Sequence, residues 1–159
     1  MCAVTDEEWL IRAVDLAVAN VADGGGPFGA LVVRGERLLG AGTNRVTTDL
    51  DPSAHAEVVA IRSACRELGD FSLEGCTLYA SCEPCPMCLG AALWARVNRV
   101  VYAADRDDAA AGGFDDRLFH DLLAGRGGDR WPLSLEHVPT DRLRDPFTAW
   151  TATPGRTEY

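Results

Sequence analysis

Hydrophobic residues recur at helical spacing near the start of the chain and then give way to short β-type runs. Thr5, followed three residues later by Glu8, forms a capping box that predicts the start of a helix. The apolar stripe of this helix consists of Leu10, Ala13, Val14, Ala17, Val18 and Val21. The runs FGALVVR (28–34) and RLLGAGT (37–43) flank a Gly35–Glu36 turn and predict a β-hairpin.

The rest of the chain alternates between helical and strand patterns. Asp51 and Pro52 are typical of a helix N-cap and first helical position, and we expect the helix to continue over 53–68. Further on, we expect strands at 76–81, 99–104 and 133–138, and helices at 85–95, 117–125 and 140–150, the last of them broken at Pro146. The acidic segment 105–116 is predicted to be a loop.

This order of elements predicts a three-layer α/β/α domain with helices on both faces of a sheet. Helical crossovers make parallel pairing the expected arrangement of the later strands. The 159 residues are expected to form a single compact domain, because a chain of this length buries roughly 70% of the surface that it exposes when unfolded.

Composition and charge narrow the classes of partner. The net charge is −9 and all 15 basic residues are arginines without an evident cluster, so a nucleic acid is an unfavourable partner and a small molecule a better one. The acidic start lacks a long apolar run, so we expect neither a signal peptide nor a membrane anchor. We therefore expect a cytoplasmic protein, in which clustered cysteines serve a metal or catalysis rather than disulfides.

The segment SCEPCPMC (81–88) concentrates three of the six cysteines. Cys85 is expected at a helix N-cap with Pro86 at the first helical position, so that Cys85 and Cys88 lie on one helix face. His55, at the start of another predicted helix, supplies a third metal ligand. Three protein ligands are typical of a catalytic zinc, which keeps its fourth position for water.

Other uses of these cysteines stay open from the sequence. Cys82, Cys85 and Cys88 have the spacing of an iron–sulfur run but lack its fourth cysteine. A thioredoxin-like redox pair of Cys85 and Cys88 would leave His55 without a role. A closed structural zinc would take Cys82 as its fourth ligand. The pairing with a histidine and an acidic residue elsewhere favours the catalytic zinc.

Glu57 lies two residues after His55 and is expected to lean over the open zinc position as a proton shuttle. A catalytic zinc lowers the pKa of a water molecule to about 7, and a nearby carboxylate can then move the proton. A zinc-binding module without enzymatic activity is the contrasting hypothesis. In such a module, Glu57→Gln would change local stability only.

The combination H-x-E and P-C-x-x-C is the signature of zinc deaminases that act on nucleobases. Together with GGPFGA, DPSAHAEVVAIR, SCEPCPMCLGA, WAR, GFDD and the closing EY, it makes the chain resemble the bacterial guanine deaminases of the cytidine deaminase-like superfamily, nearly end to end. The resemblance implies a central five-stranded mixed sheet and hydrolysis of guanine to xanthine and ammonia, a reaction of hydrolases acting on C–N bonds of cyclic amidines. It also implies one zinc ion per subunit and a homodimer that exchanges C-terminal segments, about 139–159 here.

The same resemblance implies roles for individual residues. The zinc ligands are His55, Cys85 and Cys88, and the proton shuttle is Glu57. The substrate contacts are Phe28 by stacking, Asn44 by hydrogen bonds to the ring edge, Ala56, Asp116 and Tyr159. Phe28 could equally fill the core, Asn44 a turn and Asp116 a helix cap. Cys82 and Glu83 are expected to orient the zinc ligands.

Asp141 stands where the resemblance leads us to expect a catalytic glutamate, and relative to that family one extra residue precedes Pro146. Aspartate is one methylene shorter, which bears on substrate preference because small displacements alter such chemistry. Isoguanine, 5-azacytosine, amino-triazines and guanosine therefore remain alternatives to guanine. A tRNA adenosine deaminase, which flips a base out of an RNA loop, is disfavoured by the acidic charge.

Overall fold

The computed structural model describes residues 4–130 and 132–158. The helices are α1 Asp6–Ala22, α2 Val46–Asp49, α3 Ala56–Leu68, α4 Pro86–Trp94, α5 Arg106–Ala111, α6 Arg117–Leu123, the 3-10 turn η1 Gly128–Arg130 and α7 Asp145–Ala152. The strands are β1 Gly26–Arg34, β2 Arg37–Asn44, β3 Thr77–Cys82 and β4 Arg99–Ala104.

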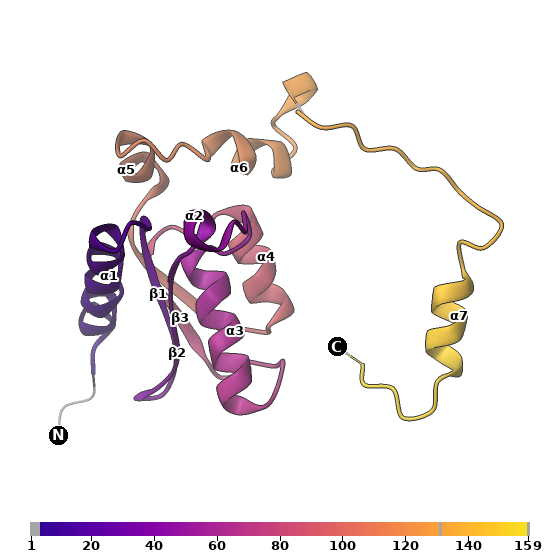
Figure 1. The fold of residues 1–159 in the computed structure, drawn as a ribbon, viewed down its shortest axis with the longest axis horizontal. Coiled ribbons are helices and arrows are strands. Elements are labelled where there is room, and N and C mark those ends of the chain that lie inside the picture. Colours follow the sequence, from indigo (N-terminus) through magenta and orange to yellow (C-terminus); the bar gives the residue numbers. More distant parts are fainter. Residues whose placement is uncertain (1–3, 131, 159) are drawn as a thin grey trace.

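The strands form one mixed sheet in the order β2-β1-β3-β4, with α1 on one face and α3 and α4 on the other (Figure 1). β1 runs antiparallel to β2 and β3, whereas β3 and β4 are parallel, as a helical crossover requires. The α/β class, the hairpin and the mixed sheet are therefore confirmed.

The prediction of five strands is wrong for the described residues, in which the sheet has four. The segment 133–138 is extended but pairs with no strand. After α6 and η1 the chain runs away from the sheet, so this segment does not reach the edge formed by β4 (Figure 1). A strand needs a neighbour to satisfy its backbone groups.

The predicted capping box of α1 is confirmed. The Glu8 amide donates to Thr5 Oγ1 at 3.2 Å and the Thr5 amide to Glu8 Oε2 at 2.8 Å. Only part of the predicted stripe is buried, because Ala13 and Ala17 pack on the sheet while its valines stay largely exposed. Trp9 completes this contact by packing against Leu31, Val33 and Tyr79.

The opposite face of the sheet carries α3 in very close contact with β2. A Cβ atom added at Gly42 would lie 2.2 Å from the backbone oxygen of Ala56, and one at Gly40 would lie 2.5 Å from that of Ala60. Glycine is required at both positions because the helix backbone occupies the space of a side chain. This approach places the start of α3 directly over the end of β2.

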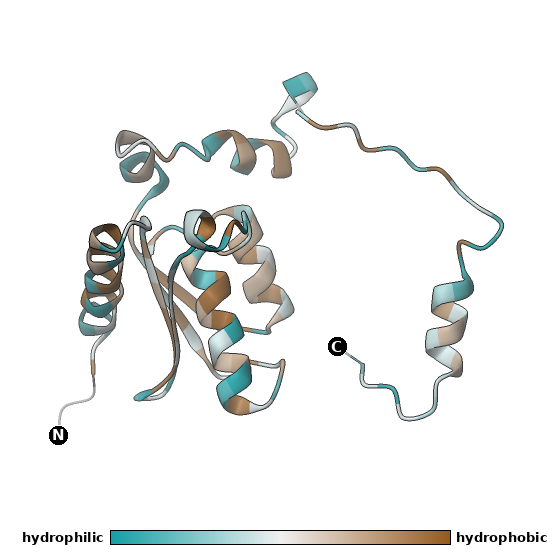
Figure 2. Cartoon of the chain, in the orientation of Figure 1, coloured by the Kyte–Doolittle hydropathy of each residue, from teal (hydrophilic) through white to brown (hydrophobic). Residues whose placement is uncertain are grey.

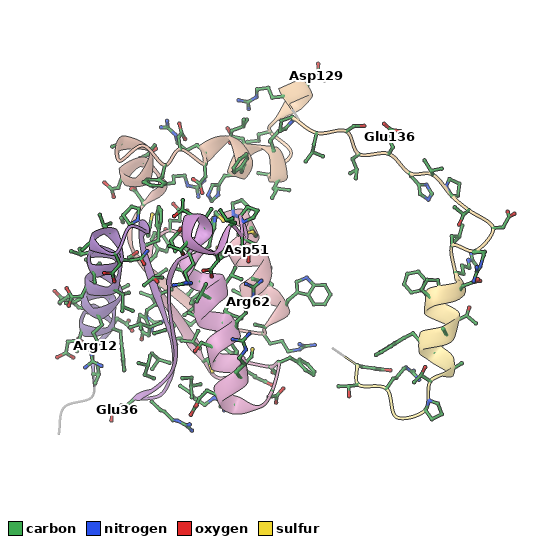
Figure 3. The ribbon with its side chains drawn as sticks, in the orientation of Figure 1. Arg12, Glu36, Asp51, Arg62, Asp129 and Glu136 are labelled. Carbon is green, nitrogen blue, oxygen red and sulfur yellow. The ribbon has the colours of Figure 1, made fainter. Side chains whose placement is uncertain are left out.

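The start of α3 differs from the prediction. The helix begins at Ala56 with His55 as N-cap, not after Pro52. Asp51 instead stabilises a turn, in which its Oδ1 accepts from the Ser53 amide at 2.8 Å and its carbonyl from Ala54 at 3.0 Å. Arg62, in the second turn of α3, forms an ion pair with Asp51, with 3.6 Å between Nη1 and Oδ2 (Figure 3).

Two other predictions need correction. The acidic segment 105–116 contains α5, because Asp105 and Asp108 form a reciprocal capping box at its start. Pro146 does not break the last helix but lies in the first turn of α7, which begins at Asp145. Proline is tolerated there because the first amides of a helix have no intrahelical partner.

Residues 132–158 extend away from the sheet and helices, with α7 standing apart (Figure 1). Apolar positions recur along this C-terminal segment (Figure 2), including Leu135, which is 93% exposed, and Phe147. Glu136 points away from the chain into solvent (Figure 3). Across the described ranges, every helix is too short or too polar to span a bilayer.

Candidate active site

His55, Cys85 and Cys88 converge on one point. His55 Nδ1 lies 3.6 Å from Cys85 Sγ and 3.5 Å from Cys88 Sγ, and the two sulfurs are 3.6 Å apart. His55 is the N-cap of α3 and Cys85 the N-cap of α4, with Pro86 at the start of that helix as predicted. Cys88 follows one turn later and is fully buried.

This triangle fits a zinc ion. Zinc bonds of about 2.3 Å to sulfur and 2.0–2.1 Å to nitrogen, in a tetrahedron, place two sulfurs about 3.8 Å apart and a sulfur and a nitrogen about 3.6 Å apart. The three observed separations agree with these values. One imidazole with two thiolates is also a donor set that zinc favours.

Cys82 does not join this group among the described residues. Its sulfur instead lies 3.7 Å from the Asp105 carbonyl, to which the thiol donates. A closed zinc site with Cys82 as fourth ligand is therefore excluded by this geometry. The contact of His55 with both sulfurs also favours a metal over a redox pair.

The two ligand thiols lie in direct contact, with 3.6 Å between their sulfurs. This contact lowers the pKa of Cys85 and raises that of Cys88. The contact with Cys85 also raises the pKa of His55. A thiolate next to a helix N-terminus is thus available to a divalent cation.

Glu57 lies in the first turn of α3 and is buried, with 8% of its surface exposed. Burial raises its pKa, because a charged carboxylate is poorly solvated there. Its side chain contacts Cys88 and faces the same cavity as His55. A carboxyl group in this environment can both accept and return a proton.

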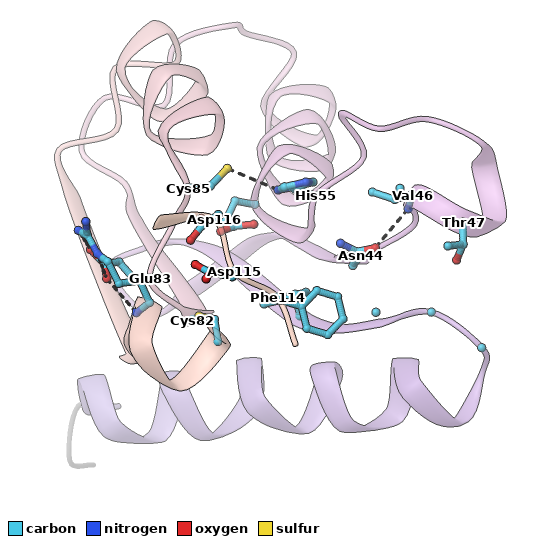
Figure 4. Close-up of a pocket in the computed structure, with 17 residues that line it drawn as sticks. Asn44, Val46, Thr47, His55, Cys82, Glu83, Cys85, Phe114, Asp115 and Asp116 are labelled. Carbon is cyan, nitrogen blue, oxygen red and sulfur yellow. Dashed lines mark hydrogen bonds and ion pairs between the residues drawn. The ribbon is translucent and has the colours of Figure 1, made fainter. Parts of the chain in front are cut away.

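A cavity of about 540 Å³ opens over the triangle, within the size range of small-molecule sites (Figure 4). His55, Glu57 and Cys85 line it, and so do three of the predicted substrate contacts, Phe28, Asn44 and Asp116. Phe28 packs edge-to-face on Phe114, with ring centres 5.0 Å apart.

Asn44 is held in place by Asn20, which the sequence did not single out. The Asn20 side-chain amide donates to the carbonyls of Gly26 and Asn44, each at 2.8 Å. The Asn44 side chain in turn accepts from the Val46 amide at 3.3 Å (Figure 4). Asn44 therefore has the backbone role that its turn-prone surroundings indicate, because its side chain binds the Val46 amide. It also lines the cavity.

Asp116 occupies the N-cap position of α6 but makes no capping hydrogen bond with its side chain. The cap position expected for Asp116 is therefore confirmed, but its side chain does not supply the capping hydrogen bond. Its carboxylate lines the cavity instead, and its negative charge raises the pKa of His55.

The cavity wall includes residues without an assigned role in the sequence analysis, above all Phe114, Asp115 and Arg106. The motif GFDD contains the first two, so the signal was present. Arg106 donates from its backbone amide (3.1 Å) and its Nε (3.0 Å) to Glu83 Oε2 and pairs with Oε1 through Nη2. This contact ties α5 to the turn before Cys85.

Three predicted site residues lie elsewhere. Ala56 has a fully buried side chain against β2 and is not part of the cavity lining. Asp141 is exposed in the turn before α7, on the C-terminal segment. Tyr159 lies outside the described residues. The proposed roles of these three residues stay predictions.

The site combines one histidine and two cysteines, which lie at the starts of two helices that pack on a mixed β-sheet. A buried glutamate lies next to them. Together these features define a zinc-dependent hydrolytic site. The chain belongs to the cytidine and deoxycytidylate deaminase family, since residues 3–104 match the model of its zinc-binding region.

Individual relatives agree with this assignment. The chain is 47% identical over 154 residues to the guanine deaminase of Bacillus subtilis (strain 168), covering 96% of this chain and 98% of the relative. An X-ray structure of guanine deaminase from Bacillus subtilis superposes with a TM-score of 0.92 at 45% identity, over 98% of this chain and 99% of that one. A guanine deaminase structure from Nitrosomonas europaea gives 0.68 at 36% identity, over 80% and 75%.

Proposed function

We propose that this protein is a zinc-dependent guanine deaminase that converts guanine and water to xanthine and ammonia. The observation that carries the proposal is the buried Glu57 facing the same cavity as the His55–Cys85–Cys88 triangle. The similarity to guanine deaminases over nearly the whole chain supports guanine as the substrate.

His55, Cys85 and Cys88 hold one zinc ion per subunit. When bound, zinc lowers the pKa of a water molecule to about 7 and so makes it a nucleophile at neutral pH. Glu57 removes a proton from the attacking water and passes it to the ring nitrogen next to the attacked carbon. It then takes the remaining proton of the added hydroxyl group and delivers it to the amino group, so that the carbonyl of xanthine forms and the C–N bond breaks as ammonia leaves.

The cavity walls account for recognition of a flat base. Phe28, braced by Phe114, offers a ring for stacking. The side chain of Asn44 hydrogen-bonds the edge of the base, and Asp116 accepts from its N–H groups, with Ala56 as a further contact at the start of α3. A carboxylate and an amide at these positions distinguish guanine from bases that lack N–H donors on the matching edge.

A homodimer would complete the site. The C-terminal segment exposes apolar residues, and α4 exposes Leu93 (78%) and Trp94 (68%), surfaces that a second copy would cover. In the proposed dimer, residues 139–159 close over the partner's cavity and bring Asp141 and Tyr159 to it. The 159 residues form one cytoplasmic domain in this proposal.

The activity test uses zinc-loaded protein with guanine and follows xanthine and ammonia. Glu57→Gln should keep its zinc and lose about 10²–10⁴-fold in kcat, the usual contribution of a general acid–base. Ammonia release no greater than that of Glu57→Gln would reject the enzyme in favour of a zinc-binding module. A parallel panel of isoguanine, 5-azacytosine, ammeline, cytosine and guanosine tests the alternative substrates.

The role of the C-terminal segment has its own test. Removal of residues 157–159 should lower turnover and leave the zinc content unchanged, while sedimentation should still give a dimer. Full activity of the truncated protein would refute the covering role of the last residues.

A further inference from the structure

His120 is a buried histidine without a role in the chemistry described so far. The buried polar or charged side chains of the described chain are Glu57, Ser81 and His120. Ser81 accepts from the Gly29 amide at 3.0 Å, and Glu57 faces the cavity. The His120 side chain, only 8% exposed, has an Nε2 atom that makes no hydrogen bond within the described residues. A buried donor or acceptor in this state is unfavourable and calls for a partner.

The nearest candidate partner is Asp116, whose Oδ2 lies 3.3 Å from His120 Nε2. The two residues are four apart, at the N-cap and in the second turn of α6, so their side chains share a helix face. The Asp116 carboxylate makes no capping bond and is 26% exposed at the cavity. The distance is within hydrogen-bonding range, but the two atoms do not form a hydrogen bond in this structure.

Glu83, a second carboxylate that interacts electrostatically with His120, already has hydrogen-bond donors. It accepts from the backbone and the guanidinium of Arg106. Asp116 is therefore the acceptor that remains for the buried imidazole.

We propose that His120 is a positioning residue that donates from Nε2 to Asp116 Oδ2 when the base is bound, and so presents the second carboxylate oxygen to an N–H group of the base. This inference rests on the proposed role of Asp116 as a substrate contact. Such hydrogen bonds are often poorly aligned in an unliganded site and tighten in the complex. A small rotation of the carboxylate is sufficient here.

The physical gain is preorganisation. A carboxylate with one oxygen held by a buried donor keeps a single orientation, which lowers the cost of ordering it around the substrate. The loss of the donor should therefore affect guanine turnover and leave zinc binding intact, because His120 is not a member of the metal triangle.

The test compares His120→Gln with His120→Asn in the zinc-loaded enzyme. The glutamine amide reaches about the place of Nε2, whereas the shorter asparagine does not, and both are neutral amides. We expect His120→Gln within about threefold of wild type in kcat/KM and His120→Asn lower by about 10- to 100-fold, the usual effect of one hydrogen bond to a charged group. Zinc content and Tm are measured for both variants, and His120→Ala serves as a variant with no side-chain donor at all.

A double-mutant cycle with Asp116→Ala then identifies the partner. In the Asp116→Ala background, His120→Asn should change kcat/KM by less than about twofold, because the acceptor is gone. Equal losses for Gln and Asn, an undiminished effect of His120→Asn in that background, or wild-type kinetics of Asp116→Ala would each overturn the inference. In all three cases guanine turnover by the wild type would stand, whereas an inactive wild type would overturn the proposed function as well.

Discussion

Cys88 Sγ lies 3.5 Å from His55 Nδ1, although 33 positions separate the two residues in the chain. The contact exists because α3 and α4 pack on the same face of the sheet with their N-termini together. The metal triangle is thus a product of helix packing, and it is already close to the shape that zinc requires.

Replacement of any ligand of the triangle should remove the metal. We expect about one zinc per chain in the wild type and less than about a tenth of that in His55→Ala, Cys85→Ser or Cys88→Ser, because two ligands hold zinc poorly. Elemental analysis of the purified proteins measures this. Cys65→Ser is the matched control, since Cys65 bonds to the Phe71 carbonyl outside the triangle. Equal zinc loss in Cys82→Ser would contradict the three-ligand site.

Gly42→Ala should weaken zinc binding through the backbone. The new methyl group would collide with the Ala56 oxygen and push the start of α3, which carries His55, away from β2 and so change its position relative to the two cysteines. We expect a loss of about 1–3 kcal/mol in unfolding free energy, together with lower zinc affinity. Gly29→Ala is the control, because its methyl group would meet the Ala13 oxygen of α1 at a similar 2.3 Å. That variant should lose similar stability and keep its zinc affinity. If both variants bind zinc as the wild type does, the triangle tolerates displacement of α3.

Arg106→Gln should impair catalysis without loss of fold. The substitution removes the guanidinium contacts to Glu83 and leaves the backbone hydrogen bond alone, so the segment carrying Phe114 and Asp116 is held less firmly at the cavity. We expect kcat/KM for guanine to fall about tenfold, mainly through KM, as is usual for residues that hold other site residues in place. Arg37→Gln breaks an exposed pair with Glu67 on the far end of α3 and should leave kinetics unchanged. Wild-type KM in Arg106→Gln would show that α5 needs no such support.

The pH dependence of stability should include a contribution from Asp6. Hydrogen bonds from Arg99 and Tyr79 lower the pKa of Asp6 from 3.8 to about 2. The folded state therefore favours the ionised form, and this stabilisation is complete above about pH 4 and lost as the pH falls through about 2. The stability difference between wild type and Asp6→Asn, measured by urea unfolding, should shrink over that interval. Arg99→Gln should remove the same pH-dependent part, and a difference that stays constant with pH would argue against the pair.

Several elements were predictable because their signals are local. The capping box of α1, the hairpin turn and the Cys85–Pro86 helix start each depend on residues within four positions of one another. The start of α3 was misplaced because Asp51 and Pro52 have the same local chemistry as a cap and a first helical residue. The structure uses Asp51 for a turn instead and leaves the cap to His55.

The sequence by itself determined the chemistry of this protein: an imidazole, two thiols and a glutamate at spacings that only a few kinds of site use. The tertiary structure alone decided that these groups meet at 3.5–3.6 Å, that Cys82 is left out and that Asp116 turns from its helix toward the cavity. The reason is that caps and periodicity act within a few residues. Distances between helices depend on how glycines such as Gly42 let them approach the sheet, and this depends on the whole fold.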